Sequence, residues 1–320
     1  MQERNELEEQ QNPFELLPNE LIATIGTHVD GNKRQLEYSN NFVLTNSLFY
    51  NTYQQERLRY QRERLKPILI EAVTAGDQDK AQKILQRYPE LLLTRGIIKD
   101  QSKRIFKNIS VWEYTLWALD VRYMAPMMLN CLPHNEQGEA IRLELVKQFD
   151  EVETKGVTYE LEGVVYHEKH YDFAIIEALK DYAVNETEKC WCTKVGQAQR
   201  LVPAHVAQHY CDLEESFYPT PTFKKEEFTR TLNFQLNHHE INQKWETWFS
   251  SSGLGINFAI LRAYYHYAIS FKMAFVAYDL AAMTTLRDVR IEDLALLKQQ
   301  LQKPLHQHDV EPDSERMQCF

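Results

Sequence analysis

Five cysteine and histidine side chains lie close together in the sequence and are the residues best suited to chemistry. They are Cys190, Cys192, His205, His209 and Cys211. Zinc prefers thiolate and imidazole ligands, and the Cys-x-Cys, His-x-x-x-His and His-x-Cys spacings could surround one ion. Cys-x-Cys is tighter than the usual Cys-x-x-Cys pair, however, and cysteines and histidines are common in helical cores. The sequence therefore favours structural roles for these residues over a metal site.

A cysteine nucleophile is the second chemistry that this segment could support. The thiol would be that of Cys190 or Cys211. A histidine base and an orienting carboxylate must lie beside it, and His205, His209 and Asp212 are available for these roles. No signature of a known cysteine-enzyme family surrounds either thiol. We therefore predict no catalytic residue and no enzyme activity, with a cysteine-dependent effector enzyme and a zinc-stapled binding module as the alternatives.

Composition excludes several classes of protein. The chain of 320 residues has five cysteines and a formal net charge of −10. It lacks the basic field that binds a nucleic-acid backbone, so we expect no nucleic-acid partner. The small, odd number of cysteines indicates thiols in a reducing compartment and not a disulfide framework. No glycine-rich phosphate loop is present, and we predict no cofactor.

Neither export nor membrane insertion is expected. The chain begins with acidic and polar residues, without the basic and then apolar layout of a signal peptide. Its most apolar stretch, 254–286, is interrupted by charged side chains that include Arg262, Lys272 and Asp279. Such charges are costly inside a bilayer, so this stretch is expected to form buried helices and no membrane span. We expect a cytoplasmic protein.

Hydrophobic periodicity predicts a mainly α fold. Apolar residues recur at helical spacing in most of the chain, whereas alternation over 157–165, around Gly156 and Gly163, predicts one small β-hairpin. From residue 139 onward we expect helices over 139–152, 172–183, 240–249, 254–286 with a break within it, and 288–302.

Two short segments near the N-terminus resemble an F-box. The first reads Leu16-Leu-Pro-Asn-Glu-Leu-Ile-Ala-Thr-Ile, with a proline at a helix start, and the second reads Phe42-Val-Leu-Thr-Asn-Ser-Leu-Phe-Tyr. Members of that family form a three-helix hook that docks on the Skp-type adaptor of a cullin ubiquitin ligase. The residues that the resemblance assigns to docking are Leu16, Leu17, Pro18, Leu21, Ile22, Ile25, Val43, Leu44, Leu48 and Phe49.

Residues 68–133 carry a repeated helix–turn–helix theme that resembles ankyrin repeats. The apolar spacing recurs after 44 residues, which places Ala72 onto Leu116. Because the family repeats every 33 residues or so, Ile97 to Lys107 would be an insertion. The resemblance implies a surface for protein recognition, with a plain helical bundle as the alternative.

The combination is similar to effectors that intracellular bacteria inject through type IV secretion. It implies an adaptor that recruits an unidentified target protein to a host Skp-cullin ubiquitin ligase, and translocation into the host cell. The expected parts are an F-box-like segment (1–65), ankyrin-like hairpins (66–150), a C-terminal helical domain (151–303) and a disordered acidic tail (304–320).

Overall fold

The computed structural model of the chain divides into two compact units, residues 1–67 and 68–320. It describes residues 47–185, 190–212, 214–227, 230–236, 244–247 and 272–305. In the first unit the described part belongs to helix α3 (Ser47–Ala75), which contains Pro67. Its arginines Arg59, Arg62 and Arg64 are exposed, as expected for an interleaved run of charges.

The predicted docking hook falls almost entirely outside the described residues. This holds for every assigned position from Leu16 to Leu44. Leu48 and Phe49 lie in α3, where only the helical backbone is described. The hook therefore stays a prediction. The acidic tail (304–320) also stays a prediction, because residues 306–320 lie outside the described ranges.

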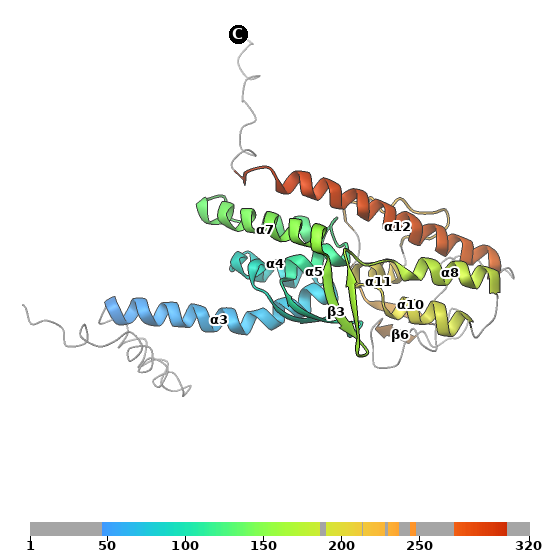
Figure 1. Cartoon of the computed structure of the whole chain (residues 1–320), viewed down its shortest axis with the longest axis horizontal. Helices are drawn as coiled ribbons and strands as arrows, with labels where there is room; N and C mark the ends of the chain where they lie inside the picture. Colours follow the sequence, from blue (N-terminus) through green and yellow to red (C-terminus); the bar gives the residue numbers. More distant parts are fainter. Residues whose placement is uncertain are drawn as a thin grey trace, which may run out of the picture. The chain divides into compact units, whose positions relative to one another are not determined.

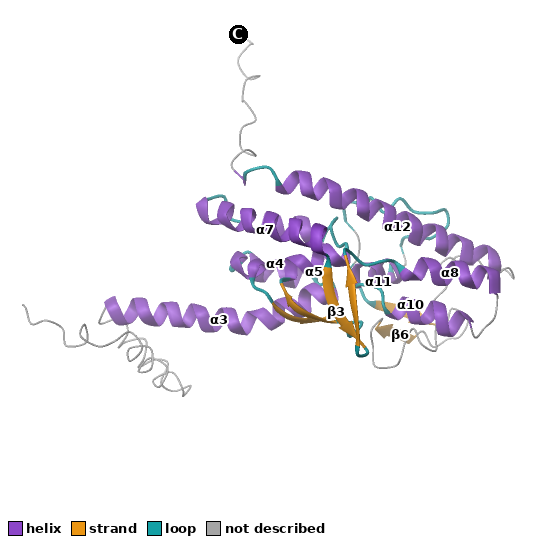
Figure 2. Ribbon diagram, viewed as in Figure 1, coloured by secondary structure: helices purple, strands orange, loops and turns teal. Residues whose placement is uncertain are grey.

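The second unit is mainly α with a small β element, as the sequence predicts (Figure 2). Helix α12 lies alongside α7 and α8 (Figure 1). After the end of α3, the helical segments of the second unit are α4 (Gln78–Leu85), η2 (Pro89–Leu93), α5 (Val111–Ala118), α6 (Met124–Asn130), α7 (Glu136–Lys155), α8 (Ala174–Asn185), η3 (Trp191–Val195), α10 (Gly196–Arg200), α11 (Ala204–Cys211) and α12 (Lys272–Leu301). The strands are β1 (Gly96–Lys99), β2 (Ile105–Ile109), β3 (Val157–Leu161), β4 (Val164–Glu168), β5 (Asn233–Leu236) and β6 (Lys244–Thr247).

The main sheet is antiparallel, in the order β1-β2-β3-β4. The predicted hairpin is β3 and β4, which turn at Glu162 and Gly163 with positive φ angles of 52° and 81° as a two-residue hairpin loop requires. The segment expected as a repeat insertion forms the added hairpin β1–β2. The ring of Phe106 packs on those of Trp117 and Tyr159, and its centroid lies 4.8 Å from that of Trp117 and 5.2 Å from that of Tyr159. This aromatic core fixes the sheet against α5.

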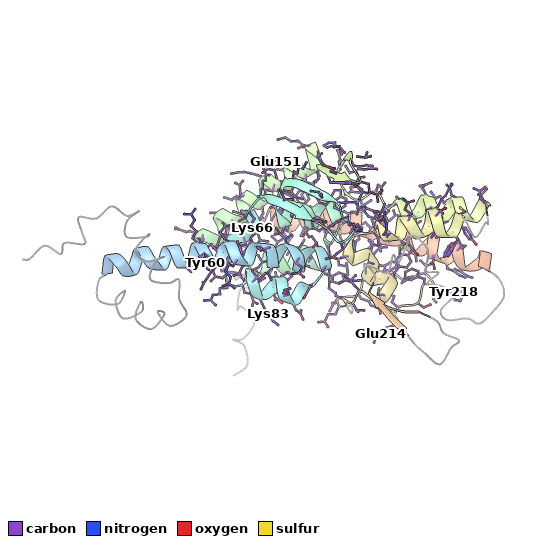
Figure 3. The ribbon with its side chains drawn as sticks, turned by 90° about the horizontal axis from the view of Figure 1, so that it is seen from below. Tyr60, Lys66, Lys83, Glu151, Glu214 and Tyr218 are labelled. Carbon is purple, nitrogen blue, oxygen red and sulfur yellow. The ribbon has the colours of Figure 1, made fainter. Side chains whose placement is uncertain are left out.

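Helix α5 begins at a capping box. Ser110 Oγ accepts from the Glu113 backbone N–H at 3.1 Å, and a Glu113 carboxylate oxygen accepts from the Ser110 N–H at 2.8 Å. Glu113 also pairs with Arg95, which bridges to Glu151 of α7, labelled in Figure 3. The local Ser-x-x-Glu pattern therefore both starts the helix and anchors it to α7.

The sequence is misleading in two places. Residues 240–249 were expected to be helical, but Lys244–Thr247 is strand β6, which pairs with β5; short apolar runs do not distinguish strand from helix. The helices expected separately over 254–286 and 288–302 are joined, because α12 runs from Lys272 to Leu301 through Arg287, and the described part of 254–286 contains no break. No glycine or proline stands there to end it. Within the described ranges, no helix has the length and apolar character to cross a membrane.

Gly76 permits the turn between α3 and α4. Its φ is +70°, and a Cβ there would lie 2.6 Å from Nε2 of Gln208. We expect Gly76→Ala to lower the free energy of unfolding by roughly 2–3 kcal/mol, from left-handed strain and displacement of the Gln208 amide. Gly163→Ala is the matched control in urea melts: its φ is +81° but nothing lies within 4 Å, so only about 1 kcal/mol should be lost. Equal losses would contradict the proposed contact.

Candidate functional site

The structure places three of the five predicted cysteine and histidine residues on α11. All eight residues of this helix are buried, and His205, His209 and Cys211 are each 1% exposed. Cys190 is also buried, but it precedes η3, which packs on α8 and α10. Among the side chains that the structure describes, which exclude that of Cys192, no three metal-ligand types gather closely enough to hold an ion.

His205 is neutral and fixed in one tautomer. Its Nε2 lies 2.6 Å from the carbonyl oxygen of Ala118, an acceptor only, so Nε2 carries the proton. Burial lowers the pKa of His205 to about 3, although the nearby Asp120 carboxylate acts in the opposite direction. Nδ1 is buried without a hydrogen-bond partner among the described atoms. His205 therefore anchors α11 to the end of α5.

His209 is held between a cation and an anion. Arg290 Nη2 lies 3.1 Å from its Nε2, so Nε2 accepts, because a guanidinium can only donate. Its Nδ1 therefore carries the proton and faces the Glu215 carboxylate at 3.6 Å. Burial lowers the pKa of His209 to about 4. Nε2 accepts from Arg290 and Nδ1 already carries a proton, which leaves neither nitrogen to remove a proton from a thiol.

Arg290 connects α12 to the loop that follows α11. It is completely buried, and burial lowers its pKa. It makes a 2.9 Å ion pair with Asp293 and donates to the Phe223 carbonyl at 3.2 Å. Its charge lies 5.4 Å from the centre of the Tyr123 ring. Both Nη nitrogens of the buried cation thus have partners within the fold, whereas its Nε is buried without a hydrogen-bond partner among the described atoms.

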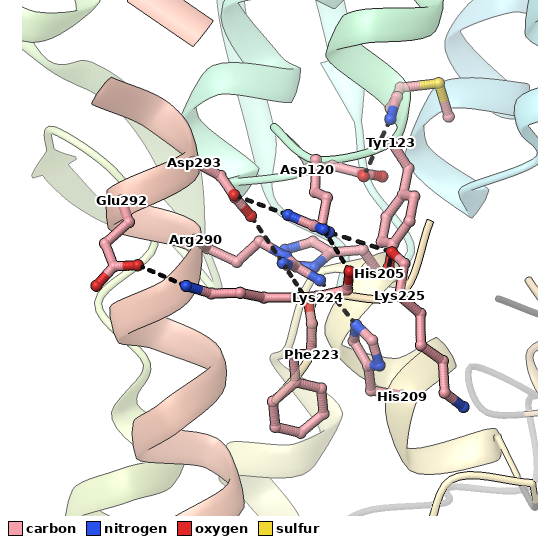
Figure 4. Close-up of polar contacts among 12 residues, drawn as sticks. Asp120, Tyr123, His205, His209, Phe223, Lys224, Lys225, Arg290, Glu292 and Asp293 are labelled. Atoms are coloured by element: carbon pink, nitrogen blue, oxygen red, sulfur yellow. Dashed lines mark hydrogen bonds and ion pairs between the residues drawn. The ribbon is translucent and has the colours of Figure 1, made fainter. Parts of the chain in front are cut away.

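The loop carbonyls are held by the turn that follows α5. Arg122 donates to the carbonyls of Lys224 and Lys225 and pairs with Asp293 at 3.0 Å. The Tyr123 hydroxyl donates to the same Lys225 carbonyl at 2.9 Å. Together with the bond from Arg290, these contacts fix three consecutive carbonyl groups (Figure 4). An irregular segment is therefore positioned by side chains where regular backbone pairing is missing.

Arg230 joins the turn at Asp120 to the turn at Gly76. It forms a largely buried ion pair with Asp120 and donates to the Gly76 carbonyl at 2.9 Å. Burial alone would raise the pKa of Asp120, but Arg230 and His205 outweigh it and lower the pKa to about 2. A cavity of about 630 Å³ opens beside Arg230, and four of its lining residues, Asp77, Asp79, Glu226 and Glu227, are acidic.

We refer to Asp120, Arg122, His205, His209, Glu215, Arg230, Arg290 and Asp293 as the polar cluster. Sequence reasoning found the two histidines but none of the arginines and acids that surround them. One signal was available on α12, where Leu286, Arg290, Asp293 and Leu297 are spaced as a buried helical face and are at most 8% exposed. Charged residues at such positions indicate a buried polar network.

Comparison with known proteins gives one relative and one domain. An uncharacterized protein of Coxiella burnetii (strain RSA 493 / Nine Mile phase I), CBUA0006, is 36% identical over 271 residues, which cover 76% of this chain and 77% of the relative. The family model described as the CBUA0006 C-terminal domain matches residues 170–301. That range contains His205, His209, Arg230, Arg290 and Asp293. No solved structure matches the chain.

Proposed function

Because this chain belongs to the family of the Coxiella burnetii protein CBUA0006, we propose that it is a bacterial protein-interaction adaptor. Its N-terminal segment binds the Skp-type subunit of a host cullin ubiquitin ligase, and the unit 68–320 binds the protein to be recruited. The bacterial origin of this relative is consistent with the resemblance to secreted bacterial effectors. The observation that carries the proposal is the F-box-like pattern of residues 16–50, which precedes a separate compact unit.

The geometry of the polar cluster supports a binding role over the cysteine-enzyme alternative. His205 and His209, the two bases that such an enzyme would use, are buried, and Nε2 of each ring is bonded within the fold. The thiols of Cys190 and Cys211 are at most 8% exposed, whereas a reactive cysteine needs a partly accessible site. The cluster thus holds a recognition unit together.

Docking through the hook would follow the helix-in-groove mode. Leu16, Leu17, Pro18 and Ile22 supply aliphatic anchors on a short helix, and burial of such anchors in a groove dominates binding energy in this mode.

A pull-down of the purified Skp subunit by the full-length chain tests the proposal. We expect binding that falls about tenfold or more when Leu17 and Pro18 are both changed to alanine, because two buried anchors are lost. Leu296→Ala is the control, since this leucine on α12 is 60% exposed and should leave binding unchanged. No binding by the unmodified chain, or full binding by the double variant, would refute the adaptor.

A further inference from the structure

Two hollows adjoin the segment 225–227. The larger is the cavity of about 630 Å³ beside Arg230, which we call the acidic hollow. The smaller, of about 330 Å³, is lined by this segment, by the turn after α5 and by α12, and we call it the apolar hollow. Glu226 lines both. Ligand sites usually have volumes of roughly 300–1,000 Å³, so each hollow can receive side chains of a partner.

The acidic hollow carries an excess of negative charge. Its acidic lining residues are all exposed to solvent, and they are Asp77, Asp79, Glu226 and Glu227. Arg230 also lines this hollow, but Asp120 balances its charge in a largely buried ion pair. Asp77 has a structural role as well, because it caps α4 by accepting from the Lys80 backbone N–H at 3.0 Å. The rim therefore attracts positive groups of a partner.

The spacing of the carboxylates fits several separate cations and not one metal ion. Among the described side chains, no three metal-ligand types lie close enough to hold an ion. Lysine and arginine side chains pair with carboxylates individually, through charge-assisted hydrogen bonds. A rim of carboxylates spread around a cavity of this volume is therefore suited to a chain segment that carries more than one such side chain.

The apolar hollow supplies a second kind of contact. Its apolar lining residues are Val121, Pro126, Leu296 and Leu297. Leu296 is 60% exposed, so a partner can cover it. The two cations that line this hollow, Arg122 and Lys225, pair with Asp293 and Glu215 of the fold. An aliphatic side chain of a partner would bury apolar area here, next to the acidic rim.

The segment that lines both hollows is fixed before any partner binds. Arg290 donates to the Phe223 carbonyl, Arg122 donates to the next two carbonyls, and the Tyr123 hydroxyl donates to the Lys225 carbonyl. A surface that is already ordered pays less entropy on binding. The polar cluster thus holds Glu226 in place between the two hollows.

We propose that the two hollows together bind a segment of the target protein in which lysine or arginine residues adjoin an aliphatic residue. The basic side chains enter the acidic hollow, and the aliphatic side chain packs on Leu296 in the apolar hollow. This inference rests on the proposed function, because it takes the recruited protein as the partner. It adds the chemistry by which the unit 68–320 selects that protein.

Fluorescence anisotropy of labelled peptides with the full-length chain is the test. The first peptide has four lysines followed by two leucines. In the second, serines replace the leucines, and in the third, glutamates replace the lysines. We expect the first peptide to bind with an affinity that falls as salt is raised, the second to bind about fivefold more weakly, and the third not to bind.

Charge reversal tests the acidic hollow. Glu226→Lys combined with Glu227→Lys should weaken binding of the first peptide about tenfold or more. The matched control is Glu144→Lys combined with Glu177→Lys, which changes the net charge equally at side chains 43% and 74% exposed on α7 and α8. It should weaken binding less than about twofold. Glu226 and Glu227 are exposed, so the double variant should keep the unmodified thermal midpoint.

Leu296→Ala tests the apolar hollow. It should weaken binding of the first peptide about threefold and leave binding of the second unchanged, because only the leucines contact this side chain. An equal effect on both peptides would overturn the shared site, as would an equal effect of the two charge-reversing pairs. Failure of the first peptide to bind the unmodified chain would also overturn it.

The Skp pull-down is a separate measurement, because residues 16–50 are proposed to carry that contact. Peptide binding without Skp binding would refute the adaptor and leave the two hollows as a binding surface. Skp binding without peptide binding would refute this surface alone.

Discussion

Replacement of Arg290 by methionine is expected to lower the free energy of unfolding by about 3–5 kcal/mol. Methionine preserves the apolar stem but removes the cation from a completely buried position. Asp293 then keeps only Arg122 as a cationic partner, and the Phe223 carbonyl loses its donor from Arg290. Buried polar groups without partners cost about 1–3 kcal/mol each, which accounts for an effect of this size.

Arg287→Met is the matched control for this change, because it lies one helical turn earlier on α12. The Arg287 side chain is 34% exposed and pairs with its neighbour Asp288. Surface changes of this kind usually alter stability by less than about 0.5 kcal/mol. Urea unfolding of both variants gives the comparison, and equal midpoints would show that Arg290 does not hold the polar cluster together.

Acidification from pH 7 to pH 5 is expected to remove about 4 kcal/mol of stability through His205 and His209. Burial depresses their folded pKa values to about 3 and 4, below the ordinary 6.5. The unfolded chain therefore binds protons that the folded chain refuses, and stability falls as the pH drops below 6.5. At pH 5 this linkage amounts to about 2 kcal/mol for each histidine.

The carboxylates of the cluster contribute little over this interval. The pKa of Asp120 is lowered to about 2 from 3.8, so its stabilising contribution is complete above 3.8 and is lost only at lower pH. Outside the polar cluster, burial raises the pKa of Asp100, which pairs with Arg104, so protonation of its carboxyl acts in the opposite direction to that of the histidines. A comparison of variants is needed to isolate the histidine effect.

Denaturant unfolding at pH 7 and pH 5 makes that comparison. A chain carrying His205→Gln and His209→Gln should lose about 4 kcal/mol less on acidification than the unmodified chain, because glutamine supplies hydrogen bonds without titrating. His134→Gln, at an exposed position, should leave the pH dependence as it was. If the double variant were as sensitive to acid as the unmodified chain, the buried neutral histidines would not be its cause.

Local patterns predicted those parts of the fold that local forces decide. The amphipathic stretch 139–152 is found within α7, which begins at the Asn135 cap and ends at Gly156. The alternation around Gly163 is found as the β3–β4 hairpin. Strand β1 was missed because its four residues are too few to show a period, and its structure depends on pairing with β2.

The polar cluster was out of reach of such patterns. Sequence spacing grouped His205 and His209, but it joined them to nearby cysteines and not to Arg290, which is 81 residues from His209. The Arg122–Asp293 pair spans 171 residues. Pairings of this range are decided by tertiary packing, and a single sequence holds only the indirect signal of charged residues on an apolar helical face.

The long range of these ion pairs also bears on how the chain reaches its folded state. Asp120 and Arg122 are translated long before Arg230, Arg290 and Asp293, and until those residues arrive the two side chains lack their oppositely charged partners. Closing loops of more than a hundred residues costs entropy before any contact repays it. Completion of the polar cluster is therefore a late step in folding. Until α12 has been synthesised, the nascent chain depends on its local helices and hairpins for stability.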